Sequence, residues 1–482
     1  MARDLWFPRP EGAILMAPPI VVVGSSLPGL LAGALLARRG ASVTLVEAAP
    51  TEGADPAPVP GLEELPVGSV RWPLHPVVDG MRSPLVPLLS ELHLPAPHPV
   101  PGTWPRYFEH GGRLSLAPLN PLSLMRSPFL SGRGKRHYLT LLFSALRAKL
   151  PEVQGERLDQ WMERVEFDEE ARGFLRDVAP AVSWCADVDD LDAAPFLSSL
   201  QEAFRSRYRV ARVPGGWAGL AAALAALITR AGGRVDPGLQ ATAVLTEGDR
   251  ARALRLADGT ELPLSGLVIA TSLEAAAVLT KGSPLEPETT PAAAAEGAGG
   301  LVLTLTLRAP ALPASLSSLY DTSRRFLVQE VPLEEWSPGA LLQEAGLPAD
   351  PVAPPTPPEG GQRLQCIAFL RGRHLRSPAH ARGAREGLHA LLDAHAPGWR
   401  GHLVAEHAAL HPRLVPVRPR VGLPATAYLP LRSAHLRNVA FASDAAGAPG
   451  RLGNAGVESA RAAADLFLPQ PLTAGARAPS PA

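Results

Sequence analysis

The chain has 482 residues, enough for two or three domains that each bury a full-sized hydrophobic core. Lys plus Arg and Asp plus Glu both number 46, so the formal net charge is zero and no overall positive field attracts nucleic acid. No apolar run approaches the roughly 20 residues that a membrane-spanning helix needs. Residues 1–17 lack the long apolar stretch of a secretory leader and are predicted to be a disordered extension, so translation begins at Met1 or at Met16. We expect a cytoplasmic protein.

The two cysteines, Cys185 and Cys366, lie far apart in the sequence, in neither a metal-ligand nor a redox-pair spacing. We predict two buried reduced thiols, with a single disulfide as the alternative. The chain has no cluster of metal ligands and no G-x-S-x-G hydrolase signature, so we expect neither a metal site nor a serine hydrolase.

The clearest pattern begins at residue 19. Residues 20–23 form a short β-branched apolar run, typical of a strand buried in a parallel sheet. A glycine turn follows, and residues 30–36 then repeat apolar side chains at helical spacing until Gly40 ends the helix. A second apolar strand ends on Glu47. The pattern predicts a β-α-β unit with an acid at the tip of its second strand.

Such a unit has the chemistry of a dinucleotide site. The helix directs its free N–H groups and the positive end of its dipole at the turn, where a diphosphate can bind. An acid about 20 residues further on can accept hydrogen bonds from the adenosine ribose. The three glycine positions of the G-x-G-x-x-G pattern hold Gly24, Ser26 and Gly29, so the middle glycine is absent. A ligand-free Rossmann-like unit is the alternative interpretation.

The next part of the chain changes from strand patterns to helical ones. Residues 107–116 are predicted to form a β-hairpin around a His-Gly-Gly turn. Residues 120–205 are predicted to be mostly helical, with a basic amphipathic stretch at 126–149. The expected explanation is a helix with a solvated basic face, and the alternative is contact with an anionic membrane surface, peripheral to the inner membrane.

Later segments return to mixed strand and helix. We predict a hairpin around Asp258 and Gly259, strands at 299–307 and 438–443, and a helix from about Gly456. Trp161, Trp184 and Phe196 are expected in the core. Arg418 and Arg420 are expected to be a solvated pair.

Four segments in this order resemble the FAD-dependent phytoene desaturase and amine oxidase superfamily, which includes protoporphyrinogen oxidase. They are the β-α-β unit, VPGGWAGLAAALAALITRAGGRV at 213–235, LADGTELPLSGLVIATS at 256–272 and NVAFASDAAGAPGRLGNAGVESARAAADL at 438–466. The resemblance covers nearly the whole chain. His75-Pro76 followed by Ser83-Pro84, with the glycine and alanine pattern at 450–464, is most similar to the bacterial phytoene dehydrogenase-related branch.

The resemblance implies an α/β fold in which a Rossmann-like FAD-binding domain is interleaved with an α+β substrate domain. The implied FAD-binding segments are 18–110, 206–280 and 426–470, the substrate segments are 111–205 and 281–425, and the disordered tail is 471–482.

The resemblance also implies the residues that contact FAD. Gly24, Ser26, Leu27 and Gly29 cradle the diphosphate, Glu47 binds the ribose, and the backbone of Ala241 contacts adenine. Gly53 follows the acid, and Asp444, Gly456 and Val457 lie against the ribityl chain and the flavin ring.

Three departures from the family pattern fall in this site. Ser26 replaces a glycine, Ala54 stands where a second glycine follows Gly53 and the preceding arginine is missing, and Ser443 replaces the glycine before Asp444. Small residues occupy the altered glycine positions, so we expect weakened rather than abolished FAD binding.

The resemblance implies an FAD-dependent oxidoreductase. Amine oxidases of the superfamily commonly place a lysine on the strand that here spans 300–307, and this strand has none. We therefore predict a desaturase or dehydrogenase that removes hydride from an apolar carotenoid-like, lipid-like or secondary-metabolite substrate. The alternatives are a catalytically degenerate binding or assembly subunit, and an amine or protoporphyrinogen oxidase. His75 is a candidate for proton exchange, although a lone loop histidine is more often structural.

Overall fold

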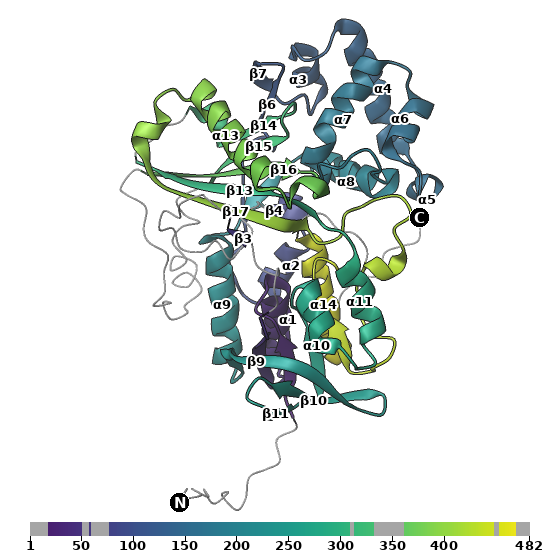
Figure 1. The fold of residues 1–482 in the computed structure, drawn as a ribbon, viewed down its shortest axis with the longest axis vertical. Coiled ribbons are helices and arrows are strands. Elements are labelled where there is room, and N and C mark those ends of the chain that lie inside the picture. The colour runs from purple at the N-terminus through teal and green to yellow at the C-terminus, as the bar shows by residue number, and fades with distance from the viewer. Residues whose placement is uncertain are drawn as a thin grey trace, which may run out of the picture.

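The computed structural model describes residues 18–50, 57–58, 77–308, 313–331, 361–447 and 453–468. These residues form a seven-stranded sheet, an eight-stranded sheet, a small three-stranded sheet and the helices around them (Figure 1). The extension at 1–17, the choice between Met1 and Met16 and the tail at 471–482 lie outside the described residues. No helix in the described ranges is long and apolar enough to cross a bilayer.

The seven-stranded sheet has the order β11-β10-β9-β2-β1-β12-β18. Its strands are β1 (Ile20–Val23), β2 (Val43–Ala48), β9 (Arg234–Glu247), β10 (Arg250–Leu256), β11 (Glu261–Pro263), β12 (Gly266–Ile269) and β18 (Val439–Phe441). The β1 strand lies between β2 and β12, both parallel to it, with Ile20 opposite Val43 and Gly266. The apolar β-branched side chains of β1 suit this position because both faces of the strand are covered.

Helices cover both faces of this sheet. They are α1 (Leu27–Arg38), α2 (Leu85–Glu91), α9 (Gly216–Arg230), α10 (Leu273–Thr280), α11 (Glu286–Ala294) and α14 (Asn454–Phe467). The α1, α2, α9 and α14 helices share one buried apolar cluster, and α10 packs in the cluster on the other face. The predicted β-α-β unit and the hairpin at Asp258 and Gly259 are confirmed.

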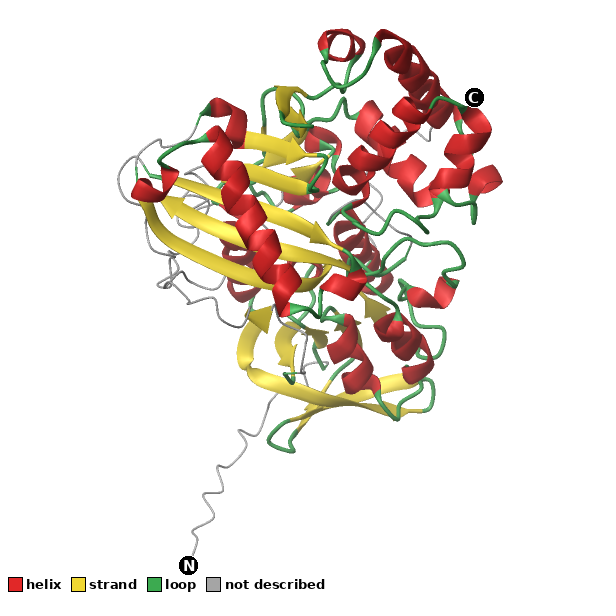
Figure 2. Cartoon of the chain, turned by 45° about the horizontal axis from the view of Figure 1, so that its top comes forward, coloured by secondary structure: helices red, strands yellow, loops and turns green. Residues whose placement is uncertain are grey.

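The eight-stranded sheet has the order β3-β17-β13-β16-β15-β14-β6-β7. Its strands are β3 (Ala57–Pro58), β6 (Tyr107–His110), β7 (Arg113–Leu116), β13 (Ala298–Leu307), β14 (Ser318–Asp321), β15 (Phe326–Val331), β16 (Gln362–Leu370) and β17 (Leu403–Val415). The predicted hairpin at 107–116 is the β6–β7 pair. Figure 2 shows α13 (Pro378–His395) lying across one face of this sheet.

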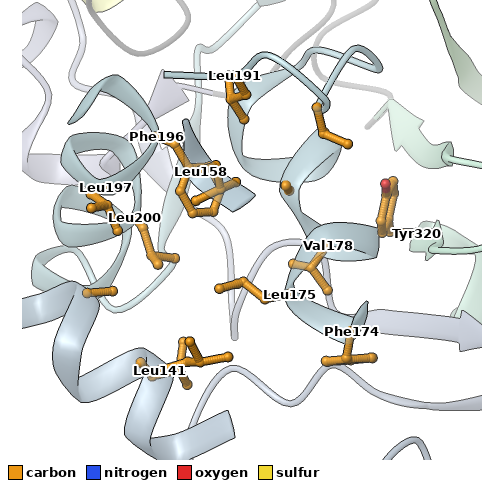
Figure 3. Close-up of a cluster of buried hydrophobic side chains, with 14 of the residues drawn as sticks. Leu141, Leu158, Phe174, Leu175, Val178, Leu191, Phe196, Leu197, Leu200 and Tyr320 are labelled. Carbon is orange, nitrogen blue, oxygen red and sulfur yellow. The ribbon is translucent and has the colours of Figure 1, made fainter. Parts of the chain in front are cut away.

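A group of helices packs against the other face. They are α3 (Pro121–Arg126), α4 (Gly132–Arg147), α5 (Leu150–Val153), α6 (Leu158–Val165), α7 (Glu169–Ser183) and α8 (Ala193–Arg205). Figure 3 shows their core, which includes Leu141, Phe174 and Phe196 of the helices and Tyr320 of the sheet. The predicted core positions of Trp161, Trp184 and Phe196 are confirmed, since each is at most 4% exposed.

The short elements complete the fold. They are β4 (Val77–Val78), β5 (His98–Pro99) and β8 (Val210–Arg212), which form the three-stranded sheet, and the 3-10 turns Gly80–Arg82, Ala314–Ser317, Gly372–His374, Trp399–His402 and Ala425–Ala427. Cys185 and Cys366 are buried and free, as predicted. The predicted domain boundaries stay predictions, and β6 from the first predicted FAD segment pairs into the eight-stranded sheet.

The prediction of a solvated pair at Arg418 and Arg420 is wrong for Arg418. Its side chain is buried, and its Nη2 donates to Asp190 at 2.9 Å and to Glu296 at 3.0 Å. The guanidinium therefore joins the loop before α8 to the loop before β13. Only Arg420 is exposed.

Candidate cofactor-binding site

The turn between β1 and α1 has room only for glycine at two positions. Gly24 has a φ of +108°, and a Cβ there would lie 2.5 Å from the carbonyl oxygen of Ala270. A Cβ at Gly29 would lie 2.2 Å from the carbonyl oxygen of Gly24. The first glycine therefore lets the turn pass the end of β12, and the other lets α1 start against the turn.

Ser26 caps the first turn of α1. Its hydroxyl donates to the carbonyl oxygen of Ala270 at 2.6 Å and accepts a hydrogen bond from the Gly29 N–H at 3.4 Å. The hydroxyl is thus directed at the end of β12. Pro28, at the second position of α1, has no N–H, so Ser26 and Leu27 supply the backbone donors nearest to the turn.

Glu47 lies at the end of β2 and faces the same turn. Its Oε1 accepts a hydrogen bond from the backbone N–H of Ser25 at 3.3 Å and another from the Ser25 hydroxyl. A carboxylate that accepts from a hydroxyl here is suited to ribose hydroxyls. Ser25 was not predicted from the sequence, although its position between Gly24 and Ser26 was a signal for it.

The first turn of α14 meets the first turn of α1. Asp444 follows β18, and its Oδ1 accepts a hydrogen bond from the Gly456 N–H at 2.8 Å. A Cβ at Gly456 would lie 2.4 Å from that oxygen and 2.7 Å from Cγ of Pro28. Burial raises the pKa of Asp444, and the Gly456 N–H partly offsets the rise. Val457 is buried in the cluster under α14.

The remaining predicted residues are more scattered. Ala241 lies on β9 beside Ala48, and its carbonyl oxygen accepts a hydrogen bond from the Ala49 N–H at 2.9 Å. Gly53, Ala54 and His75 lie outside the described residues, so their roles stay predictions. Pro28 and Ala270 help to shape the site and were missed, because only the fold brings them to the turn.

Replacing Ser26 with glycine should leave FAD binding equal or tighter, because the change removes a side chain beside the predicted diphosphate position. Losing the cap should cost only a few tenths of a kcal/mol, since glycine is a tolerated N-cap. Titration of FAD with apoprotein, followed by the flavin signal, measures the dissociation constant. Thermal unfolding measures the stability lost with the helix cap. Weaker FAD binding by the variant would contradict this placement of the diphosphate.

A row of polar side chains crosses the eight-stranded sheet on the face away from α13. His407 of β17 lies opposite Thr304 of β13, and Thr304 lies opposite Gln365 of β16. Gln365 lies opposite Gln329 of β15, and Gln329 lies opposite Ser318 of β14. We call these five residues the polar row. Gln329 donates its amide N–H to Gln365 Oε1, and both side chains are at most 4% exposed.

The neighbouring row on the same face is apolar. It contains Val302, Ile367 and Leu327, opposite one another on β13, β16 and β15, and all three belong to the buried cluster that the sheet shares with the helices α4, α7 and α8. Figure 1 shows this sheet passing between α13 and the helices of the seven-stranded sheet. His411, further along β17, is held neutral because burial lowers its pKa to about 4, with a smaller effect from His407.

These features define an α/β fold with a dinucleotide-type glycine turn at the end of its seven-stranded sheet. A family model, flavin-containing amine oxidoreductase, matches residues 73–468. The chain therefore belongs to this family, which confirms the predicted superfamily, the FAD cofactor and the FAD-dependent oxidoreductase activity. The residues present fit FAD. Gly24 and Gly29 keep side chains out of the glycine turn and the first turn of α1, and the carboxylate of Glu47 faces that turn.

Solved structures share the fold. An oxidoreductase from Methanosarcina mazei is 17% identical with a TM-score of 0.66, covering 92% of this chain and 98% of that chain. Cyclohexylamine oxidase from Brevibacterium oxydans is 18% identical with a TM-score of 0.62, covering 94% and 99%. Putrescine oxidase bound to putrescine is 13% identical with a TM-score of 0.62, covering 94% and 99%. No curated protein sequence matches the chain significantly.

Proposed function

We propose that this FAD-dependent oxidoreductase removes hydride from a C–H bond of a largely apolar, lipid-like or secondary-metabolite molecule that carries one hydrogen-bonding group. The observation that carries the proposal is the polar row beside the apolar row of Val302, Ile367 and Leu327. The polar row places amide, hydroxyl and imidazole groups beside apolar side chains, and this combination is complementary to a ligand that has both kinds of surface.

The lysine content supports a dehydrogenase or desaturase over a lysine-dependent amine oxidase. The whole chain has three lysines, Lys135, Lys149 and Lys281. Lys149 and Lys281 are exposed, and Lys135 donates to the backbone of Met125 on α3. None of them lies on β13, where amine oxidases of the superfamily commonly carry one.

The chain's own residues would hold and orient the reactants. The backbone N–H groups of Ser26 and Leu27 would bind the diphosphate, Glu47 the ribose, and the N-terminus of α14 beside Asp444 the ribityl chain and flavin. FAD supplies the hydride acceptor when bound. The polar row would fix the substrate's polar group, and His407 in that row adds an imidazole that can donate or accept a hydrogen bond.

The purified protein should be yellow, and its flavin should bleach anaerobically on addition of an apolar alcohol or acid substrate. Gln365→Leu should raise KM by about tenfold, the usual effect of losing one hydrogen bond, with little change in kcat. Cys366→Ala is the matched control, because Cys366 is the next residue on β16 and packs under α13 on the opposite face.

Three outcomes would contradict the proposal. Bleaching by amines alone would support the amine oxidase alternative in spite of the missing lysine. Colourless protein that stays folded and takes up no FAD would support the binding or assembly subunit. Equal KM changes for Gln365→Leu and Cys366→Ala would remove the polar row from the substrate site.

A further inference from the structure

The first part of the helical segment, from β7 through α4, is positively charged, and acidic residues elsewhere in the chain balance this charge. Residues 110–151 contain seven Arg or Lys and no Asp or Glu, although the whole chain has equal numbers of the two kinds. Arg133 pairs with Asp168 at 3.2 Å, and Lys149 pairs with Glu152 at 3.0 Å. Among the described residues, the exposed side chains of Arg113, Arg126, Arg136 and Arg147 form no ion pair.

The same elements expose large apolar side chains. Of the eleven that are exposed in the described part of the chain, six lie on β7, α3 and α4. They are Leu114, Leu116, Leu122, Met125, Phe143 and Leu146, which are 37% to 63% exposed. We call these six residues and the four unpaired arginines the outer patch.

The apolar side chains of the outer patch are not needed by the core. On α4, Tyr138, Leu141 and Ala145 face the buried cluster. Phe143 and Leu146 project away from this cluster. Leu146 and Arg147 share the face of Phe143 because they lie three and four residues after it, and Arg136 lies on that face two turns earlier. The α4 helix therefore has one apolar face for the core and a second, basic-flanked apolar face in solvent.

The elements of the outer patch are held together at one end of the molecule. Lys135 of α4 donates from Nζ to the backbone oxygen of Met125 on α3 at 3.0 Å. Figure 1 shows β7, α3 and α4 at the end farthest from β10 and β11 of the seven-stranded sheet. Phe167 is 88% exposed and lies beside α4. Its two neighbours in the sequence hold it there, since Glu166 pairs with His137 of α4 and Asp168 pairs with Arg133 of α4.

We propose that the outer patch docks the protein on the surface of an anionic lipid bilayer. Unpaired arginines attract acidic headgroups, and leucine, methionine and phenylalanine side chains between them can enter the boundary of the acyl chains. A nucleic acid would use the arginines and leave six apolar side chains in water. The arginines therefore account for the preference for anionic lipids, and the apolar side chains supply the hydrophobic part of the binding.

Flotation of the full chain with vesicles tests the proposal. Vesicles of phosphatidylcholine with about 30% phosphatidylglycerol should bind the protein, and pure phosphatidylcholine vesicles should not; added salt should weaken the binding. Arg136→Glu with Arg147→Glu should lower binding by at least about 25-fold, from roughly fivefold per arginine. Met125→Ser with Phe143→Ser should also lower it. Unchanged flavin content would show that both variants are folded.

Matched controls lie on other elements. Arg230→Glu with Arg255→Glu removes two exposed charges on α9 and β10, and Val278→Ser with Val404→Ser removes two exposed apolar side chains. Both should bind vesicles as the wild type does. Equal binding to neutral and anionic vesicles, equal losses in the controls, or no binding by the wild type would overturn the proposal. A dimer that Phe143→Ser disrupts, with no vesicle binding, would assign the patch to a second copy of the chain.

Discussion

Replacing Gly24 with alanine should abolish FAD binding and lower the free energy of unfolding by roughly 3 kcal/mol. The new Cβ would lie 2.5 Å from the Ala270 oxygen and 2.8 Å from its carbonyl carbon, and both are backbone atoms that cannot rotate away. The residue would also have to keep a φ of +108°. The turn must therefore move away from β12, and the donors at Ser26 and Leu27 move with it.

Gly40→Ala is the control for the backbone contribution to this effect. Gly40 also has a positive φ, +92°, but an added Cβ would meet nothing within 4 Å. The Gly40→Ala variant should lose only about 1–2 kcal/mol of stability, from conformational strain, and should bind FAD as the wild type does. Urea unfolding gives the stabilities, and flavin absorbance after desalting gives the FAD content. If both variants retain FAD equally, the contact with Ala270 does not shape the site.

Replacing Gly456 with alanine should lower FAD affinity by more than tenfold and stability by about 1–3 kcal/mol. The added Cβ would meet Asp444 Oδ1 at 2.4 Å and Pro28 Cγ at 2.7 Å, so the first turns of α14 and α1 must separate. Asp444 would also lose its hydrogen bond from the Gly456 N–H. Fluorescence titration with FAD and thermal unfolding measure the two effects.

Gly173→Ala is the control for this substitution. Gly173 lies inside α7, and an added Cβ would meet nothing within 4 Å. Alanine is the better helix former, so this variant should be equally stable or more stable by up to about 1 kcal/mol. If Gly456→Ala lowers the affinity for FAD without changing the stability, the Asp444 side chain alone moves to make room for the new Cβ.

Elements with local signals could be predicted from the sequence. The apolar run of β1, the helical spacing of α1 and the glycine turn at 111–112 are each contained within about a dozen residues. The order of the eight-stranded sheet was not predictable in this way, because β6 pairs with β14, far along the chain. Pairing between distant strands depends on tertiary packing and not on a local pattern.

The candidate site divides in the same way. Gly24, Ser26 and Glu47 follow from one local motif. Ala270 closes the turn from the end of β12, and Pro28 meets Gly456 only because two helices begin side by side. The polar row was not visible in the sequence, since its members come from five strands and single Gln or Thr residues carry no periodic signal.

The position of β12 has a consequence for how the protein is made. It pairs with β1 on one side and with β18, near the end of the chain, on the other. While the ribosome is still synthesising the C-terminal part, β12 is an open edge that can pair with another chain. Ala270, which shapes the glycine turn, directly follows that strand. Premature termination before residue 439 therefore removes no residue of the glycine turn, but it leaves the strand behind that turn exposed to aggregation.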